Sequence, residues 1–262
     1  MQWWYDEIVY IMKFIWVIQD SYGKHYNWTE LYKNVMICGS TAIYIPLEQV
    51  RHFKIQNDYI PIVIGGDDYL LLAYENKTLY KGVFNDNTFF RVDNYMAVWK
   101  HDYLNWDTKI VPCENLHLEE LPFFIRPIQD DKSLDGHVVH TYSEIQNIQL
   151  AFNKNSSFCV STVKAIHKEW RAVIVNGNIV SVCRYAIDLQ TSVSIEDVPK
   201  KMLEFVKKRI SVSNAPLAWV LDVAEYNDKY FVLECNIFNA SNFYDCDRKA
   251  IILAIEKSLQ CN

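Results

Sequence analysis

The sequence predicts a mixed fold of the α+β class. From Leu121 onward, short apolar strands alternate with amphipathic segments, which is the pattern of α/β and α+β domains. Half of the 262 residues are apolar, so the chain can bury a sizeable core. The part before Leu121 has a different texture, because it is rich in Trp and Tyr. We therefore predict an N-terminal region, 1–120, and a second domain, 121–262.

The N-terminal region contains two apolar runs that are typical of strands. They are "YIPIVIGG" (59–66) and "YLLLAYEN" (69–76), and we predict a tight turn over Gly65–Asp68 between them. The opening run, "MQWWYDEIVYIMKFIWVIQD", is as apolar as a signal peptide but carries Asp6 and Glu7 where positive charge should stand. Lys13 also leaves it too short to span a bilayer. We expect no membrane partner.

The second domain is predicted to contain three helices and several antiparallel strands. The helix over 141–153 is expected to be capped by Ser143, and the last helix, after residue 246, by Asp247. The helix over 197–210 has Pro199 in its first turn, and its buried stripe is Met202, Phe205, Val206 and Ile210. The strands are expected over 158–166, 168–188 and 218–238, and the last two fold into hairpins at Asn176–Asn178 and Tyr226–Asp228.

Composition excludes some classes of function. A net charge of -6 and a sequence pI near 5.7 argue against a nucleic-acid partner. The seven cysteines form no CxxC pair and have no metal-ligand spacing, so we expect reduced thiols and a cytoplasmic setting. His137 and His140 are three residues apart, which on a strand sends them to opposite faces and argues against zinc. Oligomeric state is not predicted.

Charged side chains lie inside the apolar strands of the second domain. Strand alternation places Glu169 and Arg171 on one face, and Glu234 and Asn236 on one face, with Cys235 pointing the other way. Asp222 lies within the neighbouring strand. One interpretation is a ladder of structural salt bridges. The other is a magnesium site, because two carboxylates and an amide oxygen are hard ligands that suit Mg²⁺ beside substrate phosphates.

The order of these motifs resembles the ATP-grasp superfamily. The order is R-P-x(4)-K from Arg126 to Lys132, E-x-R at Glu169, Arg184, D-V at Asp222 and E-x-N at Glu234. The chain is most similar to an Arg/Lys-rich clade common in phages and other viruses. The resemblance covers mainly 121–247 and implies two α+β subdomains that clamp ATP. Weaker similarity, through "KGVFNDNTFF" and "DYLNWD", implies a smaller α/β pre-ATP-grasp domain before them.

The resemblance also implies roles for individual residues. Arg126 would contact the α-phosphate, and Lys132 would reach the β- and γ-phosphates. Arg171 and Arg184, with Lys132, would be catalytic and stabilise the transferring phosphoryl group. The magnesium ligands would be Asp222, Glu234 and Asn236. The rest of the nucleotide site would be Val160, Ser161 and Thr162, whose backbone would read adenine, and Glu169.

These roles imply an ATP-dependent ligase. It would activate a carboxylate as an acyl-phosphate and pass it to an amine, on an amino acid, peptide or protein, with ATP and Mg²⁺ as cofactors. Two alternatives stay open: a phosphotransferase on the same fold, and a nucleotide-binding regulatory or interaction protein without turnover. The loop "QDDKSLDG" departs from the family, because it has few glycines and Leu134 stands where an aromatic residue is common. That departure puts closure of the loop in doubt.

Overall fold

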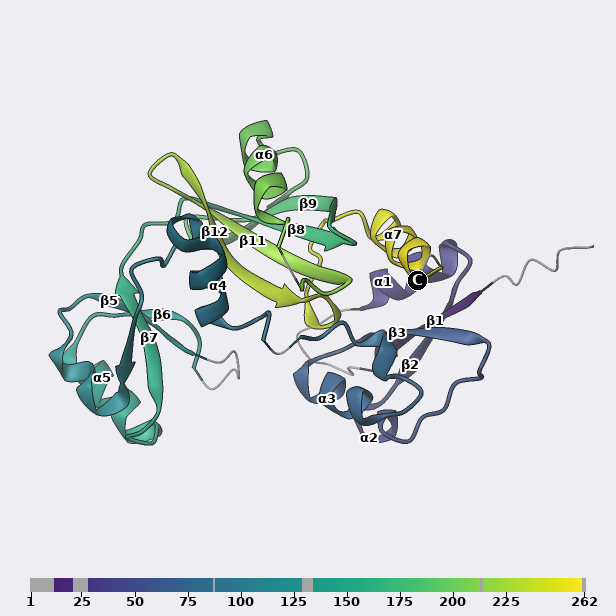
Figure 1. Cartoon of the computed structure of the whole chain (residues 1–262), viewed down its shortest axis with the longest axis horizontal. Helices are drawn as coiled ribbons and strands as arrows, with labels where there is room; N and C mark the ends of the chain where they lie inside the picture. Colours follow the sequence, from purple (N-terminus) through teal and green to yellow (C-terminus); the bar gives the residue numbers. More distant parts are fainter. Residues whose placement is uncertain (1–11, 21–27, 87, 129–133, 213, 261–262) are drawn as a thin grey trace, which may run out of the picture. The chain divides into compact units, whose positions relative to one another are not determined.

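The computed structural model describes residues 12–20, 28–86, 88–128, 134–212 and 214–260. The described chain forms two compact units (Figure 1), one from 1–84 and 248–262 and the other from 85–247. Helices and strands are both abundant, so the predicted α+β class is confirmed. The units follow contacts between residues, and the predicted division into 1–120 and 121–262 stays a prediction about functional domains.

The first unit is a three-stranded parallel sheet with helices. The strand order is β2-β1-β3, with β1 at Lys13–Gln19, β2 at Thr41–Ile45 and β3 at Tyr59–Ile64. Its helices are α1 (Thr29–Ile37), α2 (Leu47–Val50), α3 (Asp67–Glu75) and α7 (Arg248–Gln260), with a short 3-10 turn at Tyr80–Gly82. The central residues of β1 and β3 are fully buried, as expected for parallel strands covered by helices.

The run 69–76, predicted as a strand, is wrong, because it forms most of α3. Tyr69, Leu70 and Ala73 are its buried residues, and their spacing is that of one helix face. Asp67 and Asp68 occupy the first turn, where negative charge favours the helix dipole. A short run that is apolar throughout has no period, so a strand and a helix could not be distinguished from it.

The last helix, α7, belongs to the first unit although it follows the second unit in the sequence. It lies beside α1, and the Trp16 Nε1 atom of β1 donates a hydrogen bond of 2.9 Å to Glu256 Oε1 of α7. Trp16 is fully buried and Glu256 is 8 % exposed. This bond therefore anchors the C-terminal helix to the central strand.

The second unit contains a five-stranded antiparallel sheet of order β10-β9-β8-β11-β12. Its strands are β8 (Lys168–Val175), β9 (Asn178–Ile187), β10 (Gln190–Ser194), β11 (Ala218–Tyr226) and β12 (Lys229–Ile237). The two predicted hairpins are confirmed. They turn at Asn176–Gly177 and Asn227–Asp228, where all four residues have positive φ angles, as two-residue hairpin loops require.

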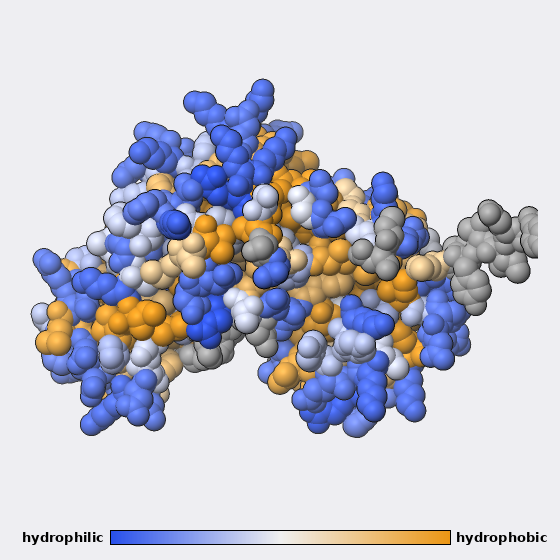
Figure 2. All heavy atoms as spheres, in the orientation of Figure 1, coloured by the Kyte–Doolittle hydropathy of each residue, from blue (hydrophilic) through white to orange (hydrophobic). Residues whose placement is uncertain are grey.

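Two helices supply the core on one face of this sheet. They are α4 (Val92–Trp99), followed by a 3-10 turn at Lys100–Asp102, and α6 (Lys200–Arg209). Met202 and Val206 of α6 are fully buried against Trp170, as the predicted stripe requires, whereas Phe205 is only partly buried. Figure 2 shows hydrophilic side chains gathered over α6, where its four lysines are exposed. The helix is therefore amphipathic.

A second sheet of the same unit has the order β4-β7-β5-β6. Its strands are β4 (Lys109–Pro112), β5 (Phe123–Pro127), β6 (His137–Val139) and β7 (Ser157–Thr162), and its helices are α5 (Tyr142–Ala151) and a 3-10 helix at Cys113–Leu118. The predicted cap of α5 is wrong by two residues. Thr141 Oγ1 accepts a hydrogen bond from the Glu144 amide, and the Glu144 carboxylate accepts one from His140 N, which together form a capping box.

Among the described helices, none is long and apolar enough to cross a membrane. The six described cysteines are free thiols, as expected. The cytoplasmic setting stays a prediction.

We predict that the Trp16–Glu256 bond holds α7 in place. Replacing Glu256 with Ala leaves the buried Trp16 indole without an acceptor, so the free energy of unfolding should fall by about 1–3 kcal/mol. Glu256→Gln keeps an acceptor oxygen and should cost less. Urea unfolding of both variants measures the difference, and exposed Glu48→Ala of α2 is the control, with a change within about 0.5 kcal/mol. An unchanged midpoint for Glu256→Ala would contradict the prediction.

Candidate functional site

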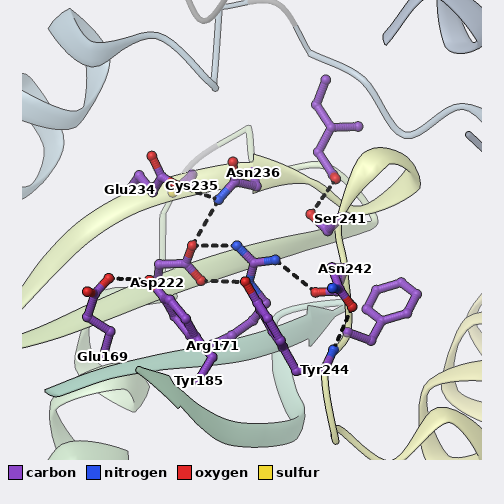
Figure 3. Close-up of polar contacts among 12 residues, drawn as sticks. Glu169, Arg171, Tyr185, Asp222, Glu234, Cys235, Asn236, Ser241, Asn242 and Tyr244 are labelled. Atoms are coloured by element: carbon purple, nitrogen blue, oxygen red, sulfur yellow. Dashed lines mark hydrogen bonds and ion pairs between the residues drawn. The ribbon is translucent and has the colours of Figure 1, made fainter. Parts of the chain in front are cut away.

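A polar cluster occupies the centre of one face of the five-stranded sheet (Figure 3). Arg171 of β8 lies directly opposite Asp222 of β11 in the antiparallel register. Arg171 Nε and Nη2 donate hydrogen bonds of 2.9 and 2.7 Å to Asp222 Oδ1 and Oδ2. The Asp222 residue is fully buried and Arg171 is 8 % exposed. The two groups form a bidentate ion pair, the geometry that fits a planar guanidinium to a carboxylate.

The remaining donors of Arg171 are held by the loop that follows β12. Arg171 Nη1 donates a hydrogen bond of 2.8 Å to the Asn242 carbonyl oxygen. The rings of Tyr185 and Tyr244 stack on one another, with centroids 5.1 Å apart, and Arg171 Cζ lies 5.5 and 5.2 Å from their centroids. The guanidinium is therefore fixed by hydrogen bonds and by cation–π contacts with two tyrosines.

Asn236 connects the two carboxylates of the predicted magnesium site. Its Nδ2 atom lies 3.0 Å from both Asp222 Oδ2 and Glu234 Oε1 and donates to each. Asp222 and Glu234 lie opposite each other on β11 and β12, beside an irregularity in the register. The structure thus brings Asp222, Glu234 and Asn236 together. Cys235 points away into the core under α4 and α6, as predicted.

The charges of this cluster are set by burial. Burial raises the pKa of Asp222 to about 6, although Arg171 opposes the shift. Burial also disfavours the charge on Arg171, but Asp222 outweighs it and raises the pKa of Arg171 further above its usual range. Burial raises the pKa of Glu169, whose Oε2 accepts a hydrogen bond of 2.5 Å from Tyr185 OH. At neutral pH the Arg171–Asp222 contact is therefore an ion pair.

The donor set fits a magnesium ion once its internal partners are exchanged. The carboxylates of Asp222 and Glu234 and the amide oxygen of Asn236 are hard ligands. The Asn236 amide now presents its nitrogen to both carboxylates, and a half-turn would present its oxygen instead. Within the described ranges, no group of three His, Cys, Asp or Glu side chains is arranged to hold a metal, so the third ligand has to be this amide.

Arg126 lies at the end of β5 and reaches the same cluster. Its Nη1 atom lies 3.5 Å from Glu234 Oε2, a longer ion pair than that of Arg171, and the two side chains are 14 % and 31 % exposed. The predicted phosphate-binding arginine therefore sits beside the predicted metal ligands. Lys132, predicted to act with it, lies outside the described residues.

Arg184 is not part of this cluster. It lies opposite Trp170, whereas Cys183 lies opposite Arg171, because the register shifts between Glu169 and Trp170. Its Nη1 atom donates to Ser192 Oγ at 2.9 Å. Its Nε atom lies 2.9 Å from Asp197 Oδ2, although the N–H bond is not directed at an acceptor, so the contact is an ion pair rather than a hydrogen bond. A joint role with Arg171 stays a prediction.

Three residues predicted to read adenine lie on β7, between β4 and β5. Val160 is a core residue whose backbone pairs with both neighbouring strands. Ser161 Oγ lies 3.3 Å from Asn105 Oδ1 and donates to it. The Thr162 amide and hydroxyl both donate to Asp107 Oδ2, at 3.0 and 2.5 Å. These groups already have partners within the protein, so their contact with a nucleotide stays a prediction.

Several site residues escaped the sequence reasoning. They are Tyr185, Asn242 and Tyr244 around Arg171, Asp197 beside Arg184, and the Asp107–Lys164 ion pair of 2.6 Å beside Thr162. Lys164 could have been noted as a lysine that follows an apolar strand. The loop "NIFNASNFYDCD" contains no pattern that would single out Asn242 or Tyr244, because its contacts depend on the path of the chain.

Comparisons with known proteins identify relatives of this architecture. A family model of the ATP-grasp domain, family 2 of its clade, matches residues 98–254. Among curated proteins, no sequence matches.

Solved structures also resemble the chain. D-alanine–D-alanine ligase from Bacillus anthracis is 12 % identical with a TM-score of 0.63, over 95 % of this chain and 98 % of that one. The ATP-grasp ligase PsnB with its minimal precursor is 12 % identical with a TM-score of 0.62, over 94 % and 99 %. A RimK domain protein from Sphaerobacter thermophilus is 12 % identical with a TM-score of 0.57, over 86 % and 92 %.

We predict that Asp222 depends on Arg171 for its stability as a buried charge. Arg171→Met leaves an uncompensated buried carboxylate, so the free energy of unfolding should fall by about 3–5 kcal/mol. The double variant Arg171→Met with Asp222→Leu removes both charges and should recover much of that loss. Urea unfolding measures all three proteins.

The matched control for this prediction is the exposed Arg91–Asp93 pair, whose side chains are 40 % and 47 % exposed. Arg91→Ala should change the free energy of unfolding by less than about 1 kcal/mol. A double variant no more stable than Arg171→Met would show that the pair does more than cancel two charges.

Proposed function

This chain belongs to the ATP-grasp family, and from that membership we propose that it is an ATP-dependent carboxylate–amine ligase. It would form an acyl-phosphate on an amino acid, peptide or protein and pass the acyl group to an amine. One observation carries the proposal: the buried cluster of Arg171, Asp222, Glu234 and Asn236 combines a phosphate-binding cation with hard oxygen ligands.

The residues of the cluster suit a magnesium nucleotide. Asp222, Glu234 and Asn236 would hold Mg²⁺, which neutralises phosphate charge when it is bound. Arg126 would take an oxygen of the polyphosphate in place of Glu234. Arg171 would leave Asp222 and donate the same two N–H groups to the transferring phosphoryl group. The protein then contributes position and fixed charge, which is most of what phosphoryl transfer needs.

The acyl-transfer step needs an amine close to the activated carboxylate. Loss of phosphate from the acyl-phosphate leaves negative charge on the departing oxygens, and Arg171 lies where it can stabilise that charge. Neighbouring structures support an amino-acid or peptide substrate. One is a D-alanine–D-alanine ligase, and another is the ligase PsnB in complex with a precursor peptide.

The alternatives predict different products. A phosphotransferase would form ADP and a stable phosphorylated acceptor, whereas a nucleotide-binding module would bind ATP without turnover. The completeness of the cluster favours the enzyme, because a module without turnover has no need of both Arg171 and three oxygen ligands. An acyl-phosphate ligase releases ADP and phosphate, and its acceptor gains the mass of the joined group less water.

The proposal is tested by turnover. Purified protein with ATP, Mg²⁺ and pools of amino acids or peptides should release ADP rather than AMP, and an acceptor should gain mass by mass spectrometry. Arg171→Lys should reduce turnover by at least about tenfold, because an ammonium lacks the planar fork. Exposed Arg91→Lys is the control and should leave turnover unchanged. Release of AMP, or ATP binding with no product from any pool, would overturn the proposed reaction.

We predict that Glu234 is a metal ligand rather than a structural partner. Glu234→Gln removes one charge from a crowded acidic cluster and gives up only a long, partly exposed contact with Arg126, so the melting temperature without ligand should stay equal or rise slightly. The variant should lose the magnesium-dependent rise in melting temperature that ATP gives the parent. A thermal-shift series with ATP, with and without Mg²⁺, measures both effects.

The control for the Glu234 series is Glu225→Gln at the far end of β11. It should keep the full magnesium response. A Glu234→Gln protein that melts earlier yet keeps its magnesium response would support the salt-bridge interpretation of the cluster instead.

A further inference from the structure

Two thiols meet beside the Arg171 site. Cys183 of β9 and Cys246 of the loop between β12 and α7 are fully buried, and their sulfur atoms lie 3.3 Å apart. Cys183 stands directly opposite Arg171 in the sheet register. The buried cysteines Cys113, Cys159 and Cys235 instead pack within hydrophobic clusters of the core. The pair therefore has a different setting from these three thiols.

Both sulfurs also touch the backbone that positions Arg171. The Cys246 thiol points to the Arg171 carbonyl oxygen at 3.8 Å, and the Cys183 thiol points to the Phe243 carbonyl oxygen at 3.9 Å. Between these contacts the loop provides the Asn242 carbonyl and the Tyr244 ring that hold the guanidinium. A covalent bond between the sulfurs would therefore tie this loop to the sheet at the point where it grips Arg171.

The two thiols are chemically unequal. The hydrogen bond from Cys246 lowers the pKa of Cys183 against the effect of burial, and the positive charge of Arg171 lowers it further. The same hydrogen bond and burial raise the pKa of Cys246. A thiolate is the form that reacts with peroxides and disulfides, so Cys183 is the expected nucleophile and Cys246 the resolving thiol.

We propose that Cys183 and Cys246 are a site of reversible disulfide formation, which peroxide closes and a dithiol reductant opens. The disulfide would hold the loop 238–247 against β9 and keep Arg171 on Asp222, which lowers the affinity for magnesium–ATP. The effect on ATP rests on the proposed function, whereas formation of the disulfide does not. The sulfurs need to approach from 3.3 Å to about 2 Å, a movement that a loop can supply.

The reaction balances with hydrogen peroxide as the oxidant. The Cys183 thiolate attacks one peroxide oxygen, so an S–O bond forms, the O–O bond breaks and hydroxide leaves to take up a proton as water. The Cys246 sulfur then attacks the sulfenic sulfur, so the S–S bond forms, the S–O bond breaks and a second water leaves. The two thiols lose two electrons and the peroxide gains them.

The first experiment maps the bond in the full-length protein. The folded protein is treated with hydrogen peroxide, its remaining thiols are alkylated, and its peptides are analysed by mass spectrometry without reductant. We expect a linked peptide that joins Cys183 to Cys246, a rise in melting temperature of about 5–10 °C, and reversal of both by dithiothreitol. Cys183→Ala and Cys246→Ala should abolish both, and Cys113→Ala, which removes another buried thiol, should keep both.

The second experiment measures ATP binding by calorimetry, with Mg²⁺, before and after oxidation. The parent should lose affinity at least tenfold on oxidation and regain it on reduction, whereas Cys246→Ala should not respond. Free or sulfinic Cys183 and Cys246 in the oxidised protein would overturn the disulfide. A mapped disulfide with unchanged ATP affinity would overturn its effect on the site. A reduced protein that binds no ATP would instead refute the proposed function, and the peptide map would still decide the disulfide.

Discussion

The buried ion pair between Arg171 and Asp222 is the constraint on which the site depends. Desolvating two charges in the middle of a sheet costs several kcal/mol for each ion, and their attraction compensates only with good geometry and further hydrogen bonds. The structure supplies both, through the direct register of β8 with β11, the Asn236 amide on the carboxylate and the Asn242 carbonyl on the guanidinium. Strand register, the β12 motif and the loop after it all serve this one pair.

The same pair explains why a cation and a phosphate would bind together. A metal ion alone on Asp222 would leave the Arg171 guanidinium buried without a carboxylate, and a phosphate alone on Arg171 would strand the Asp222 charge. Either half-exchange carries the large penalty of an unpaired buried charge. A magnesium nucleotide supplies both partners at once, so the exchange of Arg171 and Asp222 to new partners keeps every charge compensated. The arrangement thus selects the complex over its components.

Alternation along strands made most of this site predictable. The shared face of Glu169 with Arg171 and of Glu234 with Asn236 follows from a period of two, and the two hairpin turns follow from their Asn and Gly residues. Arg184 was misplaced beside Arg171 because a register shift in β8–β9 breaks that period, and no residue type signals it. The partners of Arg171 from the loop 238–247 were unpredictable, since they depend on tertiary contacts rather than on local periodicity.

The two arginines of the site differ in how firmly they are held, and this difference orders the events of binding. Arg126 meets Glu234 at 3.5 Å with both side chains partly exposed, a contact of small energy. Arg171 is held by a bidentate carboxylate, a carbonyl and two aromatic rings, nearly out of water. An incoming polyphosphate can therefore take Arg126 at little cost and only then compete for Arg171, when a metal ion is present to replace it on Asp222. The loosely held arginine captures the nucleotide, and the tightly held one is released only when the complete ligand is in place.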